Sequence, residues 1–146
     1  LFYPNIRDPK NFLDYLSNLN YNFKFIIYTS KAEILKPYLN SLSHKLDIRE
    51  PINRDKLITE MSGVDFLINI KNKDNITQVP SKLIDYKLSK RPILEISSEF
   101  LPQEKINFDN FIKQDYTKQK KINNFEKYDS KKVAENFIKL YYLNNE

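Results

Sequence analysis

Short apolar runs that alternate with amphipathic segments constrain the fold of this chain more than any other feature. Runs with the length and β-propensity of strands lie at 23–28, 46–49, 65–70 and 93–96. Apolar residues at helical spacing lie around them, at 8–19, 31–42, 53–62, 82–90 and 130–141, with a weaker pattern at 108–113. Strands that alternate with helices are typical of a parallel sheet that helices cover on both faces. We therefore predict an α/β fold, with residues 1–146 as a single domain.

Particular residues mark where several of these helices begin or end. Asp8 with Pro9 makes a good helix start, because the fixed φ of proline suits the first turn. Asn53 and Ser130 are typical N-cap residues, and each predicts the start of the helix that follows it. Gly63, the only glycine in the chain, lies where the third of these helices should end.

The residue composition excludes several classes of site. With 146 residues, of which 40% are hydrophobic and 14% aromatic, the chain can form a folded core. It has no cysteine, so disulfides, thiolate catalysis and cysteine metal sites are excluded. His44, the only histidine, is predicted to be an ordinary polar residue late in a helix. A single histidine is too few for most histidine metal sites, and it leaves one candidate base for Ser-His-Asp catalysis. We therefore expect no metal.

The sequence carries no mark of export or membrane insertion. No apolar run approaches the roughly 20 residues that a bilayer-spanning helix needs. The chain also lacks a charged start followed by an apolar run and a cleavage site. We therefore expect a cytoplasmic protein, and the absence of cysteine is compatible with a reducing compartment.

The positive charge of the chain favours anionic partners. Its net charge is +5 and its pI is near 9.2, so nucleotides, nucleic acids and acidic membrane surfaces all qualify. Lys118, Lys120 and Lys121 form one local cluster, which lacks the interleaved aromatic residues of a nucleic-acid module. We interpret that cluster as a solvated loop and expect no nucleic-acid partner. Contact of the basic surface with a membrane is compatible with the charge.

The stretch from Gln78 to Leu94, QVPSKLIDYKLSKRPIL, carries most of the chemical information. Pro80 suits the first turn of a helix, and Pro92 ends that helix before the strand at 93–96. Together with the strand at 65–70 this stretch forms a βαβ unit, whose loop lies at the carboxyl end of a strand. In open parallel sheets that end is the side on which ligands bind.

The start of this helix has the groups that a nucleotide needs. A helix start presents unpaired backbone N–H groups, and here Ser81 adds a hydroxyl and Lys82 a positive charge, which together suit phosphate. Asp85, about one turn further on, can accept hydrogen bonds from the vicinal hydroxyls of a ribose. The alternative is that Ser81 only caps the helix while Lys82 and Asp85 are solvated surface charges, and the spacing leaves both interpretations open.

Five segments together resemble a known family: NIRDPKNFLDYL near the start, then KFIIYTS, LINI, QVPSKLIDYKLSKRPIL and, near the end, VAENFIKLYY. They are similar, in register over essentially the whole chain, to the C-terminal domain of family 4-like GT-B glycosyltransferases. The resemblance implies a Rossmann-like parallel sheet with helices on both faces, which forms one half of a GT-B fold and holds the donor. It also implies that a separate N-terminal domain, which binds the acceptor, belongs to the intact enzyme, so that residues 1–146 are part of a longer chain.

The resemblance assigns roles to individual residues. Ser81 and Lys82 would lie at the diphosphate of the donor, and Asp85 would bind the ribose hydroxyls. Arg7 matches the basic residue that contacts the diphosphate, and Lys10 is a second candidate for that contact. The base would lie against the backbone near 50–52.

Three features depart from the pattern of the family. Thr77 stands where the family usually has a glutamate, eight positions ahead of the ribose carboxylate, and Gln78 beside it is our candidate for a donor contact. Asp85 stands where glutamate is usual, so its carboxylate reaches one methylene less far. The glycine-rich turn that is common in the family is missing.

We therefore expect the donor-binding domain of a glycosyltransferase, which binds a nucleotide-diphosphate sugar as its substrate and needs no cofactor. The full enzyme would transfer the sugar to a glycan or a lipid-linked acceptor, and the isolated domain would bind nucleotide without turnover. One alternative, which the departures support, is a non-catalytic nucleotide- or partner-binding α/β module. A nucleic-acid-binding protein is the other, and only the positive charge favours it.

Overall fold

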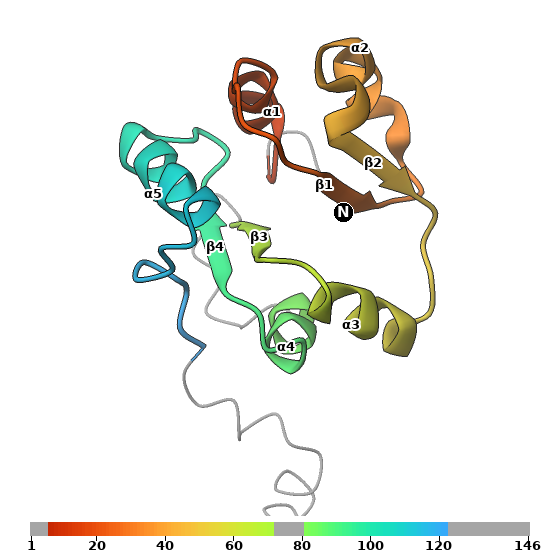
Figure 1. Cartoon of the computed structure of the whole chain (residues 1–146). Coiled ribbons are helices and arrows are strands. Elements are labelled where there is room, and N and C mark those ends of the chain that lie inside the picture. The colour runs from red at the N-terminus through yellow and green to blue at the C-terminus, as the bar shows by residue number, and fades with distance from the viewer. Residues whose placement is uncertain (1–5, 72–80, 123–146) are drawn as a thin grey trace, which may run out of the picture.

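The computed structural model describes residues 6–71 and 81–122 of the chain, which fold into a mixed α/β arrangement (Figure 1). In chain order the elements are α1 (Lys10–Ser17), β1 (Phe25–Tyr28), the 3₁₀ helix η1 (Ala32–Tyr38), α2 (Leu39–Leu42), the 3₁₀ turn η2 (Ser43–Lys45), β2 (Leu46–Arg49), α3 (Arg54–Ser62), β3 (Leu67–Ile70), α4 (Ser81–Leu88), β4 (Ile93–Ile96) and α5 (Pro102–Ile112). The predicted helix at 130–141 lies outside the described residues.

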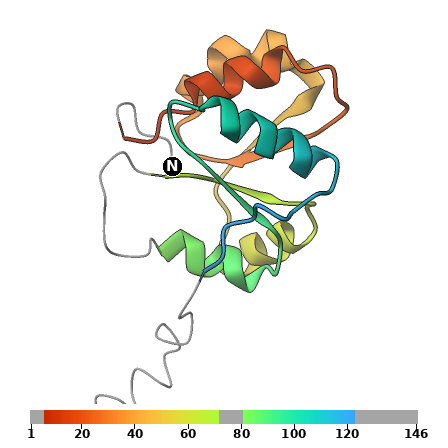
Figure 2. The same ribbon diagram turned by 90° about the vertical axis from the view of Figure 1, so that its left-hand side faces the viewer.

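The strands lie between two layers of helices, as the alternating pattern predicts. Helices α1, α2 and α5 lie on one side of the strands, and α3 and α4 lie on the other (Figure 2). The larger apolar core lies under the first layer, where the buried ring of Phe12 meets the rings of Phe25, Phe100 and Phe108 edge to face. A smaller core of Met61, Leu67 and Ile93 lies under α3 and α4.

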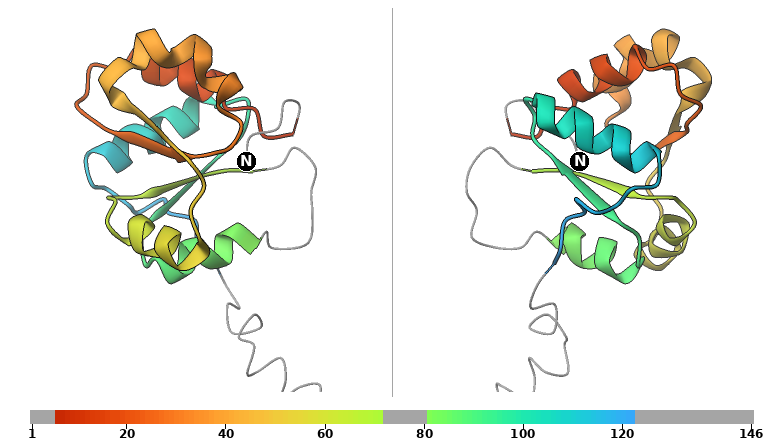
Figure 3. Two further views of the ribbon diagram at one scale, coloured as in Figure 1. Left: turned by 90° about the vertical axis from the view of Figure 1, so that its right-hand side faces the viewer. Right: turned by 60° about the vertical axis from the view of Figure 1, so that its left-hand side comes forward.

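Strand pairing differs from the single sheet that the sequence predicts. In the described residues the strands form two parallel ladders, β1 with β2 and β3 with β4, and no ladder joins β1 to β3. Strands β1 and β3 nevertheless both lie between the two layers of helices (Figure 3).

The second edge of β3 has side-chain partners. The N–H groups of Leu67 and Lys71 donate to Pro92 O, just before β4, and to Ile96 O, and because alternate residues of a strand face opposite edges, Ile68 and Ile70 face away from β4. Side chains of α4 bind the carbonyls of those two residues: Tyr86 Oη donates to Ile68 O at 3.3 Å, and Lys82 Nζ donates to Ile70 O at 3.4 Å. These carbonyls therefore have side-chain partners in place of a neighbouring strand.

Several predicted helix boundaries are confirmed. Helix α3 begins after Asn53, whose side-chain oxygen accepts a hydrogen bond from the backbone N–H of Lys56 at 2.9 Å, as expected of an N-cap. It ends at Gly63, whose φ of −89° is an ordinary right-handed value, so this C-cap does not use the conformational freedom of glycine. Asp8 Oδ1 accepts from the N–H of Lys10 at 2.9 Å at the start of α1.

Two predicted helices are wrong in type or length. The helix expected at 31–42 is a 3₁₀ helix up to Tyr38, with Pro37 inside it, and only Leu39–Leu42 is α-helical. His44 accordingly lies in the exposed turn η2, after the helix. The short helix expected at 108–113 is the longer α5, which begins with Pro102 at its first turn.

Candidate functional site

The predicted site lies where α4 begins, beside the carboxyl end of β3. Ser81 is the first residue of α4 and is exposed, and Lys82 follows it with a half-buried side chain. Lys82 and Tyr86 are four residues apart, so they project from one face of α4 onto β3. This spacing holds the Lys82 ammonium at Ile70, the last residue of β3. The carboxyl end of this strand is where the sequence predicts ligand binding.

The structure brings Arg7 into the electrostatic environment of Lys82. The pKa of Lys82 is lowered from 10.5 to about 8, first by burial and then by the positive charge of Arg7, while the carboxylate of Glu95 acts in the opposite direction. The charge of Arg7 also acts on Tyr86, whose pKa is nevertheless raised because burial dominates. Two cationic side chains that are 75 positions apart in the sequence are thus held near one helix start.

A polar pair, a buried asparagine and a partly buried glutamate, lies on the neighbouring strands. Asn69 of β3 and Glu95 of β4 face each other in the ladder, and Asn69 Nδ2 donates to Glu95 Oε2 at 3.0 Å. Lys120 Nζ binds the other carboxylate oxygen at 2.9 Å. Asn69 is 2% exposed, and in the part of the chain that the structure describes its Oδ1 has no hydrogen-bond partner. Sequence analysis missed this pair, although an Asn and a Glu inside LINI and ILEI were a visible signal.

Asp85 is paired with a residue that sequence analysis did not single out. Arg54, the first residue of α3, donates to Asp85 Oδ1 from Nε at 2.8 Å and from Nη2 at 2.7 Å. The Asp85 side chain is 24% exposed and that of Arg54 is 59% exposed, so the pair lies at the surface between the starts of two helices. The two residues are 31 positions apart, and only the packing of α3 against α4 brings them together.

Other predicted contacts lie apart from this centre or outside the described residues. Lys10 is exposed at the start of α1, where its backbone carbonyl accepts a 3.4 Å hydrogen bond from Tyr38 Oη. The charge of Lys10 is not among the causes that shift the pKa of Lys82, which are burial, Arg7 and Glu95. Gln78 and Thr77 are outside the described residues, so the prediction for Gln78 stays a prediction.

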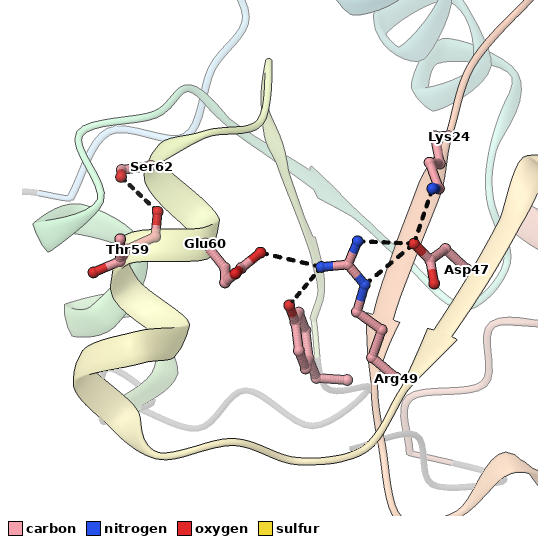
Figure 4. A network of polar contacts seen from close by, with 7 residues as sticks. Lys24, Asp47, Arg49, Thr59, Glu60 and Ser62 are labelled. Carbon is pink, nitrogen blue, oxygen red and sulfur yellow. Dashed lines mark hydrogen bonds and ion pairs between the residues drawn. The ribbon is translucent and has the colours of Figure 1, made fainter.

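A polar network at β2 fixes the position of α3 (Figure 4). Arg49 binds Asp47 at 2.9 Å, Tyr28 Oη at 2.9 Å and Glu60 of α3 at 3.1 Å, while Lys24 binds Asp47 at 3.1 Å. Hydrogen bonds from Arg49 and then Lys24 lower the pKa of Asp47, so its carboxylate stays charged under ordinary conditions. The network joins β1, β2 and α3, and α3 in turn carries Arg54.

A cavity of about 310 Å³ lies at the opposite end of the strands. Phe23 and Lys24, just before β1, line it together with Asp65 and Phe66, just before β3, and with Tyr116. It therefore opens at the amino ends of β1 and β3, away from Lys82, and is separate from the predicted site.

Residues 6–71 and 81–122 contain no group of three or more acidic or histidine side chains that could hold a metal ion. None of the helices in the same ranges has the length and hydropathy to cross a membrane. Comparison of the chain with protein-family models, with curated proteins and with solved structures gives no match.

Proposed function

We propose that this chain binds a nucleoside-diphosphate sugar and is the Rossmann-like donor-binding domain of a GT-B glycosyltransferase. The observation that carries the proposal is the half-buried Lys82 at the start of α4, on which the charge of Arg7 acts, with the carboxylate of Asp85 about one turn further on. The resemblance in sequence names the same residues for the diphosphate and the ribose.

An anion is the ligand that these charges favour. Holding Lys82 partly buried and near Arg7 disfavours its protonated form, as its lowered pKa reflects. A diphosphate placed at the helix start would offset both the burial and the repulsion, and the unpaired N–H groups of the first turn would add hydrogen bonds. Cationic side chains with that helix start are the parts of an anion site, and Asp85 adds a hydroxyl acceptor beside it.

In the full enzyme the same groups would assist sugar transfer. Negative charge develops on the nucleoside diphosphate as the glycosidic bond to it breaks, and Arg7 and Lys82 would stabilise that charge. The acceptor, a glycan or a lipid-linked molecule, and any general base would be held by the second domain. We therefore expect this chain alone to bind nucleotide and to transfer no sugar.

A non-catalytic module is the second candidate, and two contacts favour it. Lys82 Nζ donates to Ile70 O, and Asp85 binds Arg54, so both predicted ligand-binding groups have partners within the chain. In that case these residues hold α4 against β3 and α3, and the surface serves to bind a partner.

Titration with nucleotides separates the two candidates. Calorimetry and thermal shift with UDP, GDP and ADP should show that one of them binds and stabilises the protein. Lys82→Ala and Asp85→Ala should each weaken that binding roughly tenfold or more, because each removes a charge-assisted hydrogen bond. Lys87→Ala is the matched control, since Lys87 is an exposed lysine on the same helix.

The outcomes are distinct. Binding that is lost in the first two variants and kept in Lys87→Ala supports a donor site. Absence of binding by all three nucleotides would refute it and favour the non-catalytic module. Sugar transfer by the isolated chain would refute the expectation that the second domain supplies the acceptor site.

A further inference from the structure

We infer that Arg54 is a positioning residue of the nucleotide site, which orients the Asp85 carboxylate so that it can bind the hydroxyls of a ribose. The inference rests on the proposed function and deepens it, because it makes the distinction between ribonucleotides and deoxyribonucleotides depend on a residue of α3. Neither the sequence pattern nor the resemblance assigns a role to Arg54.

The geometry of the pair leaves one carboxylate oxygen outside it. Both guanidinium contacts, from Nε at 2.8 Å and from Nη2 at 2.7 Å, end on Asp85 Oδ1. Here Oδ2 is not part of the pair, so a fixed carboxylate retains an acceptor for a ligand.

The position of the pair suits a ligand at the start of α4. Asp85 lies three residues beyond Lys82 on α4, so the phosphate-binding and hydroxyl-binding groups are about one turn, or roughly 5 Å, apart along the helix axis. Arg54 approaches from α3, which follows the carboxyl end of β2. The Arg54–Asp85 pair therefore lies toward the carboxyl ends of the strands, where we propose that the ligand binds.

Arg54 lies at a helix start that hydrogen bonds hold in place. It is the first residue of α3, directly after Asn53, whose side chain caps the helix at 2.9 Å. Near the end of α3, two residues before Ser62, Glu60 binds Arg49 of β2 at 3.1 Å. These contacts fix both ends of the helix, so the guanidinium approaches Asp85 from a defined direction.

Stability alone does not account for this ion pair. Side chains exposed to 59% and 24% form a pair that water screens, and such surface pairs contribute little to folding. A carboxylate whose orientation is fixed, by contrast, binds hydroxyls without first losing rotamer freedom. Loss of Arg54 should thus affect ligand selection more than folding.

The test compares ribose and deoxyribose ligands in the full 146-residue chain. Affinities for UDP, GDP and ADP, for their 2′-deoxy forms and for inorganic pyrophosphate are measured by calorimetry with wild type, Arg54→Ala and Asp85→Ala. We expect wild type to prefer the ribose form by roughly tenfold, the typical effect of a hydrogen bond to a charged group. Arg54→Ala should lose most of that preference and keep its affinity for pyrophosphate.

Two further variants separate positioning from charge and from folding. Lys56→Ala removes the same charge from the same exposed turn of α3 without touching Asp85, and it should keep the preference for ribose. The double variant Arg54→Ala with Asp85→Ala should be no worse than Asp85→Ala alone, because the two residues act through one contact. The thermal midpoint of each variant reports its folding.

Each outcome decides the inference. An unchanged ribose preference in Arg54→Ala, with pyrophosphate still bound, overturns the positioning role and leaves the proposed function in place. An equal loss for pyrophosphate and nucleotides assigns Arg54 to the phosphate and also overturns it. Absence of binding by wild type overturns the proposed function and this inference together.

Discussion

At the scale of single residues, Lys82 is the predicted ligand-binding residue that burial and a neighbouring positive charge affect most clearly. Its side chain lies half-buried against β3, and its pKa is lowered to about 8 by burial and by Arg7. A group in this state weakens the folded protein while it is charged, and an anion can reverse that cost. Residues of this kind are typical of binding sites, although structural networks also produce them.

Removing the charge of Lys82 should stabilise the protein near pH 7. Between pH 8 and 10.5 the unfolded chain keeps the proton that folded Lys82 has lost, so stability rises with pH in that window. Lys82→Met should therefore gain stability over wild type near neutral pH, by at most about 3 kcal/mol, and by less because water screens the side chain and Ile70 O loses its hydrogen bond. The gain should shrink as pH rises through the window to 10.5.

Urea unfolding at several pH values measures this effect. The difference between Lys82→Met and wild type isolates one lysine from the tyrosines that titrate at high pH, such as Tyr15 with its pKa raised to about 12. Lys87→Met, on the exposed face of the same helix, should show no gain that depends on pH. A stability difference between Lys82→Met and wild type that stays the same from pH 7 to pH 10.5 would contradict this effect of the buried charge.

At the scale of the elements, Glu104 determines how α5 begins. Its Oε1 accepts from the N–H of Ser97 at 2.8 Å, and its Oε2 accepts from Ser97 Oγ at 2.7 Å and from the N–H of Leu101 at 2.8 Å. One carboxylate therefore caps α5 and also ties it to the carboxyl end of β4.

Glu104→Ala should destabilise the protein by about 2–3 kcal/mol, because the buried Ser97 would keep unpaired polar groups. Gln103→Ala is the control, since Gln103 is exposed and its side chain makes one 3.2 Å hydrogen bond, to Asn107. Denaturant titration of both variants tests the assignment. Equal midpoints for Glu104→Ala and wild type would refute it.

The elements also show what the sequence could predict. The strand at 93–96 and the cap at Asn53 were predicted correctly, because local β-propensity and N-cap chemistry decide them. The length of α5 was missed although Pro102 and Glu104 are a typical helix start, since its apolar pattern is weak there. The 3₁₀ form of η1 was missed because the apolar stripe around Pro37 fits an α-helix equally well.

Within the site, the same limit applies to contacts between distant residues. Ser81, Lys82 and Asp85 were predicted together because they lie close together at the start of one helix. Arg54 was not, because its partner Asp85 lies 31 positions away and only the packing of two helices joins them. Periodicity predicts which face of a helix is buried, and it does not predict which charged groups meet.

At the scale of the whole molecule, the described residues have two distinct ends. Lys82, on which the charge of Arg7 acts, and the Asn69–Glu95 pair lie toward the carboxyl ends of β3 and β4. The amino ends of β1 and β3 carry the cavity of about 310 Å³ with its aromatic lining. We propose that an anionic ligand binds at the first end, and because the strands separate the two ends, binding at one can be distinguished from binding at the other.

Backbone amide chemical shifts measured by NMR during titration with inorganic pyrophosphate test this claim most directly. The account predicts that the largest changes occur at Arg7 and in the first turn of α4, at Ser81 and Lys82, and that Lys82→Ala removes them. Changes centred on Gly63 and Asp65 at the cavity, or no changes at any amide, would contradict it.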